Sequence, residues 1–265
     1  MYDFHYAKAK SVDDASAKLK ATAESKILAG GMTLLPTLKL RLAKPAALVD
    51  LGALPDLEGI TVSGGTVTIK SMTRHADVAR SADVANAIPA LVALAGGIGD
   101  TQVRHRGTIG GSVANNDPAA DYPAGCLGLG ATIITNTREI TADDFFKGLF
   151  TTALAEGEII TAIRFPVPER AAYVKFKNPA SRYAIVGVLA SKGPAGVRVA
   201  VTGAGDSGVF RVPAMEKALT ASFTAKAIDG ISVPVDTMLG DIHASGEYRA
   251  HLVSVMAKRA VAACG

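Results

Sequence analysis

The sequence predicts an α+β protein with two mixed α/β subdomains and a smaller C-terminal domain. The first sign is a strand, a glycine turn and a helix near the start of the chain, at residues 26–42. The second is an alternating apolar pattern on both sides of Ser63-Gly64-Gly65, which is typical of a β-hairpin. The third is a change in the sequence pattern after Pro168, where three β-rich runs and a long helix follow. These observations place the subdomains at about 1–55 and 56–168 and the C-terminal domain, of antiparallel sheet plus helices, at 169–265.

The first subdomain is expected to be a small βαβ unit that follows a helix. Ser11 reads as an N-cap with acids in the first turn, so this helix should run to about Ala23. Lys26–Ala29 reads as a strand that leads into glycines. Leu34–Leu42 then has helical spacing, and Ala47–Leu51 is the next strand of the unit.

The second subdomain is expected to alternate strands and helices up to a pair of prolines. Pro166 and Pro168 end its last strand and mark the domain boundary. The expected strands are 60–62, 67–69, 131–135, 139–141 and 159–165, and the expected helices are 73–79, 85–95 and 118–129.

The C-terminal domain is expected to be an antiparallel sheet closed by helices. Polar turns that contain Pro and Gly separate its β-rich runs, and the last helix has apolar residues along roughly one face. The expected strands are 173–177, 184–190 and 196–203, and the expected helices are 212–219 and 243–264.

Composition indicates a globular protein and argues against a nucleic-acid partner. The chain has 265 residues, of which 49% are hydrophobic, which is enough to form hydrophobic cores. Its net charge is +4, but 24 acids are scattered among 28 bases without a basic block. Cys126 and Cys264 lie far apart and fit reduced, buried thiols. No leader pattern or long apolar run is present, so we expect a soluble cytoplasmic protein without a transmembrane segment.

The glycine turn Ala29-Gly30-Gly31-Met32-Thr33 is the first candidate binding element. A turn between a strand and a helix presents free N–H groups, which favours a bound phosphate. Junctions of a strand, two glycines and a helix are also common in proteins where they have only a structural role. The third glycine of GxGxxG is missing and no acid follows a strand about 20 residues on, so a Rossmann site is disfavoured.

The stretch Gly99–Tyr122 is the second candidate element and the one most like a cofactor site. Glycines here lie among hydroxyl, amide and acid groups, so Thr108–Ser112 is expected to turn sharply and bring its amides against a diphosphate or a flat ring. Asn115, Asn116, Asp117 and Asp121 would offer donors and acceptors to the hydroxyls of a small molecule. The alternative is a tight loop of hydrogen-bonded Asx turns.

No metal site is expected. His75 falls on a predicted helix, and no second histidine or acid stands at metal-ligand spacing, so a surface or core histidine is the favoured interpretation.

Taken together, Ala29–Pro36 and Thr108–Tyr122 resemble the paired flavin signatures of molybdenum hydroxylase FAD subunits. More specifically, the chain resembles the FAD-binding medium subunits of aerobic carbon monoxide dehydrogenases, within the xanthine dehydrogenase family. The resemblance covers the whole length and includes the closing segment Gly240–Arg249. It implies a p-cresol methylhydroxylase-type FAD-binding domain followed by a small C-terminal domain.

The resemblance also implies which residues bind FAD. Both glycine segments would hold the pyrophosphate through backbone amides, Asp121 would bind the sugar-diphosphate region, and Tyr183 would lie against the isoalloxazine. A contact near the end of the domain falls on Ile159 or Ile160. Met32 stands where several relatives have a polar residue, which leaves only a backbone contact. The full set is Ala29, Gly30, Gly31, Met32, Thr33, Thr108, Ile109, Gly110, Gly111, Ser112, Asn115, Asp117, Asp121, Ile160 and Tyr183.

The implied function is electron transfer without substrate chemistry on this chain. FAD would be bound noncovalently, and no catalytic residue is expected, since flavin chemistry needs positioning more than a protein acid or base. The chain has too few cysteines for an iron–sulfur cluster. Molybdopterin cytosine dinucleotide and [2Fe–2S] clusters are therefore expected on a large and a small partner subunit, in a dimer of heterotrimers.

Several alternatives remain open from the sequence. The external acceptor would be a quinone, a carrier or NAD, and the complex would reach the inner face of the membrane as a peripheral assembly. The same subunit type would also serve a xanthine, N-heterocycle or aldehyde dehydrogenase. A cofactor-free scaffold subunit is the non-enzyme alternative.

We expect a partner subunit to dock near Arg104–Arg106 and the turn Asn115–Asp117, because these groups flank the second glycine segment.

Overall fold

The N-terminal part is a three-stranded parallel sheet with two helices. The computed structural model describes all 265 residues. Strands β2 and β3 are joined through α2, as the predicted βαβ unit requires, and the sheet order is β1-β3-β2. The Ser11 hydroxyl accepts a hydrogen bond from the Asp14 amide at 3.0 Å and begins α1 as predicted. The elements are β1 (His5–Lys8), α1 (Val12–Ala21), β2 (Ser25–Leu28), α2 (Leu34–Lys39) and β3 (Ala47–Asp50).

A five-stranded antiparallel sheet forms the middle of the molecule, in the order β4-β5-β10-β6-β7. The predicted hairpin is confirmed: Gly64 and Gly65 have positive φ of 55° and 73° and join its two strands. The strands are β4 (Ile60–Ser63), β5 (Thr66–Lys70), β6 (Thr132–Thr135), β7 (Glu139–Thr141) and β10 (Ile160–Pro166). A two-stranded hairpin, β8 (Phe146–Gly148) and β9 (Thr151–Thr152), lies beside them.

Seven helices accompany the middle sheet, and their apolar faces share one core with it. Val67, Leu91 and Ile163 are fully buried there. The predicted single helix 85–95 was wrong, because Pro89 has no N–H and disfavours a helical conformation at Ile88, where one helix ends and the next begins. The helices are α3 (His75–Arg80), α4 (Ala82–Ala87), α5 (Pro89–Gly96), α6 (Thr101–Arg106), α7 (Ile109–Asn115), α8 (Asp121–Leu129) and α9 (Ala142–Phe145).

The predicted sharp turn at residues 108–112 was also wrong. Two short helices, α6 and α7, occupy this part of the chain. Asp100 Oδ1 accepts from the Val103 amide at 2.8 Å, and Thr108 Oγ1 accepts from the Gly111 amide at 3.2 Å, so each helix has a side-chain N-cap. Gly110 and Gly111 therefore lie in the first turn of α7, and neither has positive φ.

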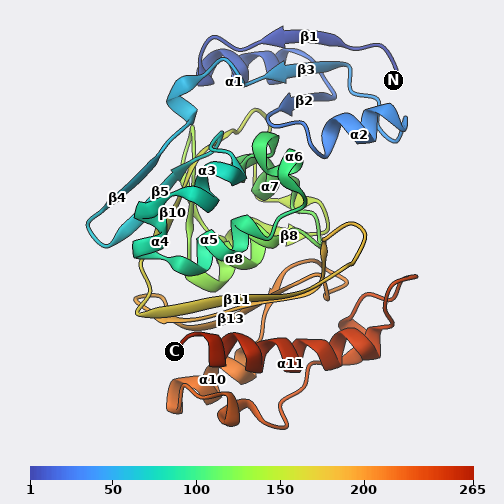
Figure 1. Cartoon of the computed structure of the whole chain (residues 1–265). Helices are drawn as coiled ribbons and strands as arrows, with labels where there is room; N and C mark the ends of the chain where they lie inside the picture. Colours follow the sequence, from blue (N-terminus) through green and yellow to red (C-terminus); the bar gives the residue numbers. More distant parts are fainter.

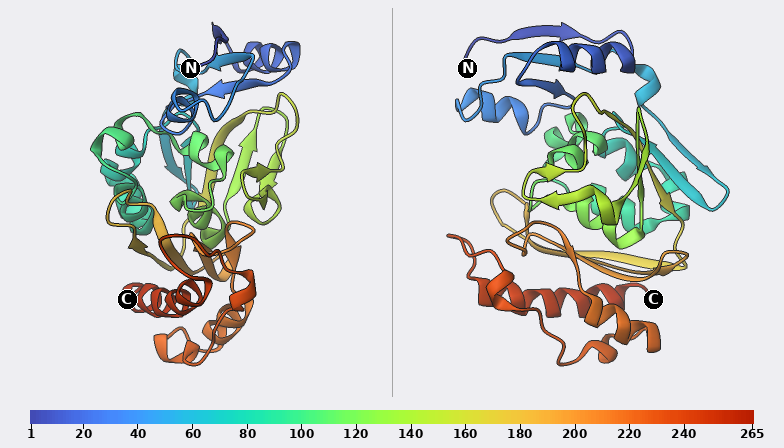
Figure 2. Two further views of the ribbon diagram at one scale, coloured as in Figure 1. Left: turned by 90° about the vertical axis from the view of Figure 1, so that its right-hand side faces the viewer. Right: turned by 180° about the vertical axis from the view of Figure 1, so that it is seen from behind.

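The C-terminal part is an antiparallel sheet in the order β11-β12-β13-β14, covered by helices. Figures 1 and 2 show this sheet between the middle helices and the two terminal helices, with the N-terminal sheet at the opposite end of the molecule. The long last helix begins at Gly246 rather than at His243, because Ser245 is its N-cap. The elements are β11 (Arg170–Lys177), β12 (Ala184–Gly193), β13 (Gly196–Thr202), β14 (Phe210–Arg211), α10 (Pro213–Ala221), α11 (Gly246–Ala263) and three short 3₁₀ helices (Pro55–Leu57, Ala225–Ile228 and Val235–Thr237).

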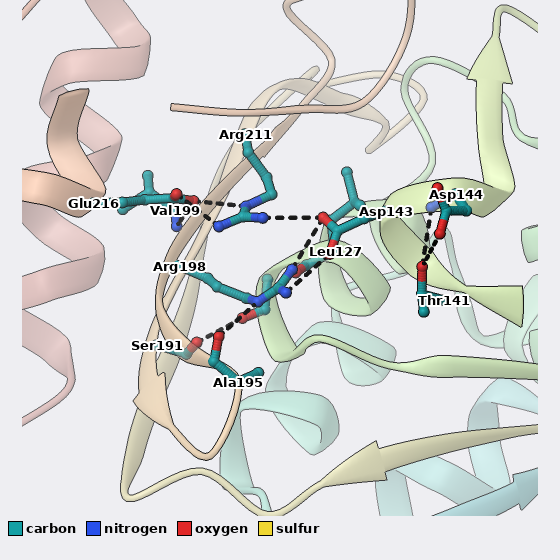
Figure 3. Close-up of polar contacts among 11 residues, drawn as sticks. Leu127, Thr141, Asp143, Asp144, Ser191, Ala195, Arg198, Val199, Arg211 and Glu216 are labelled. Carbon is teal, nitrogen blue, oxygen red and sulfur yellow. Dashed lines mark hydrogen bonds and ion pairs between the residues drawn. The ribbon is translucent and has the colours of Figure 1, made fainter. Parts of the chain in front are cut away.

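A charged cluster ties the C-terminal sheet to the middle part (Figure 3). Arg198 on β13 and Arg211 on β14 both pair with Asp143 on α9, at 2.9 and 3.1 Å, and Arg211 also pairs with Glu216 at 2.7 Å. Partial burial of the Asp143 carboxylate favours a higher pKa, but Arg198 and Arg211 outweigh it and hold the pKa of Asp143 below its usual range. The cluster therefore fixes the two parts relative to each other. No helix is both long enough and apolar enough to cross a membrane.

Candidate functional site

One large cavity lies where the three parts of the molecule meet. Its volume is about 700 Å³, which is in the usual range for ligand and cofactor pockets. Its walls come from the turn between β2 and α2, from segment 98–121, and from the turn between β11 and β12, with Phe150 added from the β8–β9 hairpin. The cavity is therefore built by residues far apart in sequence.

The first glycine turn contributes unused backbone donors to this cavity. The amides of Ala29, Gly30, Gly31, Met32 and Thr33 donate no hydrogen bond within the chain, and all five residues line the cavity. Gly31 has φ of +74°, which lets the backbone curl. Consecutive N–H groups without partners are the arrangement that binds anions in other proteins.

Gly30 is required where this turn meets the end of α6. A Cβ at this position would lie 2.1 Å from the Arg106 carbonyl oxygen and 2.8 Å from Gly107 Cα. Both atoms belong to the backbone, so no side-chain rearrangement could relieve the overlap. The close approach brings the two glycine segments together at the cavity.

The second glycine segment has a different role from the first. The Ile109 amide donates to Thr73 O at 3.1 Å, and the Gly110 amide donates to Ser71 O at 2.8 Å, so these two amides bind α7 to the segment that follows β5. A Cβ on Gly110 would lie 2.5 Å from Ser71 Cβ. The residues of this segment that line the cavity are Thr108, Gly111 and Ser112.

Asp121 lies in the cavity wall and is held by the C-terminal sheet. It is 4% exposed, and Lys175 Nζ on β11 is 2.9 Å from its Oδ1. The Tyr173 hydroxyl donates a second hydrogen bond to the same carboxylate. Burial raises the pKa of Asp121 more than the neighbouring Lys175 lowers it. Asp121 thus links the cavity to β11.

The turn between β11 and β12 brings Tyr183 to the cavity. Asn178 Oδ1 accepts hydrogen bonds from the Ala180 and Ser181 amides, at 2.9 and 3.1 Å, which shapes this turn. Tyr183 is 45% exposed, and the partial burial of its hydroxyl, together with Asp117, raises the pKa of Tyr183. The aromatic ring is therefore available at the mouth of the cavity.

Twelve of the fifteen residues selected from the sequence line this one cavity. They are Ala29, Gly30, Gly31, Met32, Thr33, Thr108, Gly111, Ser112, Asn115, Asp117, Asp121 and Tyr183. Ile109, Gly110 and Ile160 do not line it: Ile109 and Ile160 are 0% and 5% exposed within the main core, and Gly110 packs on Ser71.

Sequence reasoning missed several residues of the cavity. His75 lines it and is 4% exposed; burial, reinforced by Arg104, lowers the pKa of His75 to about 4, so the ring is neutral at physiological pH. Phe150 and Arg182 also line it, and both have positive φ, of 53° and 63°. No sequence signal marks a non-glycine residue that adopts this conformation.

Arg104, in the expected docking surface, is engaged inside the chain. Its Nη1 donates to Ile98 O at 2.9 Å and to Gly99 O at 3.2 Å. Arg106 is exposed and makes no such bonds from its side chain. The two arginines are therefore not equivalent.

Comparison with known proteins places the chain in one family over nearly its whole length. The family model described as "FAD binding domain in molybdopterin dehydrogenase" matches residues 2–168. The nicotine 6-hydroxylase medium subunit of Paenarthrobacter nicotinovorans is 35% identical, over 98% of this chain and 96% of that protein. The carbon monoxide dehydrogenase medium chain of Hydrogenophaga pseudoflava is 33% identical, over 97% and 96%.

Solved structures agree with this placement. A carbon monoxide dehydrogenase structure from Hydrogenophaga pseudoflava has a chain that superposes with a TM-score of 0.90 at 34% identity, covering 99% of this chain and 97% of that one. A reconstituted carbon monoxide dehydrogenase from Oligotropha carboxidovorans gives 0.91 at 33% identity, covering 99% and 98%. The chain therefore belongs to the FAD-binding domain family of the molybdopterin dehydrogenases, as a medium-type, FAD-binding subunit of a molybdenum hydroxylase.

Proposed function

We propose that this chain is the FAD-binding electron-transfer subunit of an aerobic carbon monoxide dehydrogenase. The observation that supports FAD binding is the run of five unused amides, from Ala29 to Thr33, in a cavity of about 700 Å³, and the similarity to carbon monoxide dehydrogenase medium chains supports the kind of complex. A diphosphate is the anion that such a run of donors suits best, because several N–H groups can share its charge. The residues present therefore fit FAD.

Different cavity residues would contact different parts of a noncovalently bound FAD. The amides of residues 29–33 would donate to the diphosphate, and the Thr108 and Ser112 hydroxyls would add donors from the neighbouring second glycine segment. Asp121 would accept hydrogen bonds from hydroxyls of the sugar-diphosphate region, and Tyr183 would lie against the isoalloxazine. Ile109 and Gly110 would act by positioning α7, and Ile160 by supporting the core behind the site.

The protein's contribution to electron transfer is positioning rather than acid–base chemistry. When bound, FAD supplies the ability to take up electrons in pairs or singly and to pass them on. His75 is neutral and buried in the cavity wall, so it adds no charge to the cavity. We assign no catalytic residue to this chain.

Membership of this family supports the presence of partner subunits. We propose that a large molybdopterin-binding subunit and a small subunit with [2Fe–2S] clusters complete the complex, as a dimer of heterotrimers in the cytoplasm or at the inner face of the membrane. A quinone, a carrier or NAD would accept the electrons. We also propose that the FAD-binding domain spans residues 1–168 and the C-terminal domain 169–265.

A second substrate class has a specific observation in its favour. The nicotine 6-hydroxylase medium subunit is at least as similar in sequence as the carbon monoxide dehydrogenase chains, at 35% against 33% identity. An N-heterocycle hydroxylase is therefore the alternative complex for this subunit.

The test is to offer substrates to the intact complex and follow the flavin. Purified under anaerobic conditions, the complex receives carbon monoxide, a nicotine-type heterocycle or an aldehyde in separate samples. Carbon monoxide should bleach the flavin absorbance, while this chain alone, loaded with FAD, should not respond. Bleaching by the heterocycle and not by carbon monoxide would replace the first proposal by the second. A complex that contains no flavin would refute both.

A further inference from the structure

The β8–β9 hairpin carries a combination of features that the chain alone does not explain. Phe150, at its tip, is 60% exposed and has φ of 53°. Both features are unfavourable for a phenylalanine, since the left-handed conformation crowds its Cβ and the exposed ring meets water. Phe150 nevertheless lines the cavity, as the one residue that the hairpin contributes.

Asn116 holds this hairpin in place. It is 1% exposed, and its Nδ2 donates to Gly148 O at 2.7 Å and to Thr151 O at 2.9 Å. Its own carbonyl accepts a hydrogen bond from the Phe150 amide at 3.1 Å. The side chain and backbone of Asn116 thus make three hydrogen bonds, to three residues of the hairpin between positions 148 and 151.

Strained backbone is concentrated at the cavity. Five non-glycine residues have positive φ, and three of them, Asn116, Phe150 and Arg182, line the cavity or lie between two residues that do. Residues in this conformation persist when the surrounding structure enforces them, and they gather at ligand clamps. For Phe150 the enforcing contacts are the hydrogen bonds between Asn116 and the hairpin. Asn116 itself is the left-handed C-cap of α7, and the Arg182 amide donates to Asn178 O.

We infer that Phe150 is a wall of the FAD site and that Asn116 is the positioning residue that presents it. The inference rests on the proposed function, because it takes FAD to be the occupant of the cavity. In this account the Phe150 ring stays exposed until FAD covers it, and burial of the ring adds to the affinity. Asn116 touches no part of FAD and acts only through the hairpin.

The left-handed conformation of Phe150 and Asn116 allows a test in which each side chain is removed without strain in the backbone. Glycine adopts positive φ without strain, so Phe150→Gly removes the ring without distorting the backbone. Asn116→Gly likewise removes the two side-chain hydrogen bonds to the hairpin and keeps the backbone bond to Phe150. Leu149→Ala is the matched control, since Leu149 neighbours Phe150, is 40% exposed and does not line the cavity. Flavin-free full-length chains are titrated with FAD, the dissociation constant is read from flavin fluorescence, and thermal midpoints are measured without FAD.

Phe150→Gly should weaken FAD binding by about tenfold, as loss of an aromatic contact does, while the thermal midpoint of the flavin-free chain stays the same or rises. A residue with a purely structural role would lower both. Asn116→Gly should weaken binding to a similar extent, and the double variant should be no weaker than either single variant, because both act through one contact. Iodide should quench the bound flavin more in both variants than in the wild type, and Leu149→Ala should match the wild type.

Two results would overturn the inference. One is an FAD affinity of Phe150→Gly equal to that of Leu149→Ala. The other is fully additive losses in the double variant, which would give Asn116 a role apart from the hairpin. A wild-type chain that takes up no FAD would instead refute the proposed function, so the two failures are distinguishable.

Discussion

Replacing Glu158 with glutamine should remove a pH-dependent part of the chain's stability. The Glu158 side chain is 2% exposed, and its carboxylate is paired with Arg138 at 2.9 Å. It accepts five hydrogen bonds, from the Thr135 and Thr137 hydroxyls, the Ala155 amide and two nitrogens of Arg138. The Arg138 guanidinium, with these other donors, lowers the pKa of Glu158 to about 2.

The sign and size of the effect follow from linkage. Because the folded-state pKa is below the ordinary value of 4.5, the ionised carboxylate stabilises the fold at neutral pH, and this contribution is lost as the pH falls from about 5 toward 2. The contribution is on the order of 3 kcal/mol at pH 7, and roughly 1.4 kcal/mol of it is lost by pH 3.5. Glu158→Gln lacks the contribution at both pH values.

Urea unfolding followed by circular dichroism measures the difference. We expect the free-energy gap between the wild type and Glu158→Gln to be on the order of 3 kcal/mol at pH 7 and to shrink by about 1.4 kcal/mol at pH 3.5. The control is Glu169→Gln, since the pair between Glu169 and Lys192 is about half exposed, and such pairs contribute little. A gap that does not change with pH, or a control that behaves like Glu158→Gln, would refute the reasoning.

Three further substitutions test the cavity and its surroundings. Gly30→Ala places a Cβ 2.1 Å from the Arg106 carbonyl oxygen, so the flavin content of the purified chain should fall at least tenfold, whereas Gly96→Ala, with its nearest neighbour 3.9 Å away, should keep full content. Lys175→Met leaves the buried Asp121 carboxylate without its cation and should lower the free energy of unfolding at pH 7 by about 3 kcal/mol; an unchanged urea midpoint would contradict the account. Arg106→Glu should keep FAD but reduce co-purification with the iron–sulfur subunit, and unaltered assembly would remove this surface from consideration.

The periodic parts of the fold were predictable from the sequence. The βαβ unit, the β4–β5 hairpin and the antiparallel strands β11 to β13 follow from apolar spacing and turn residues, and the structure contains all of them. The unused amides of the first glycine turn were predictable too, because a strand that ends at Gly30-Gly31 and enters a helix leaves N–H groups without partners.

Other features depend on tertiary contacts and leave no local signal. Helix α7 begins at Ile109, after the Thr108 N-cap, but Gly110 and Gly111 in its first turn have low helix propensity and suggested a loop. The bond between Asp121 and Lys175 joins residues 54 positions apart. The left-handed conformation of Phe150 is enforced by Asn116, and nothing in the residues around Phe150 indicates it.

Whether this chain holds FAD without a covalent bond is tested by the flavin content of the purified protein. The full-length chain, or the complex that contains it, is precipitated with acid, and the supernatant and the washed pellet are assayed separately for FAD. We expect about one FAD per chain, all of it in the supernatant, because every contact proposed between the cavity residues and FAD is noncovalent. A folded chain that contains no flavin and takes up none when FAD is added would contradict the account.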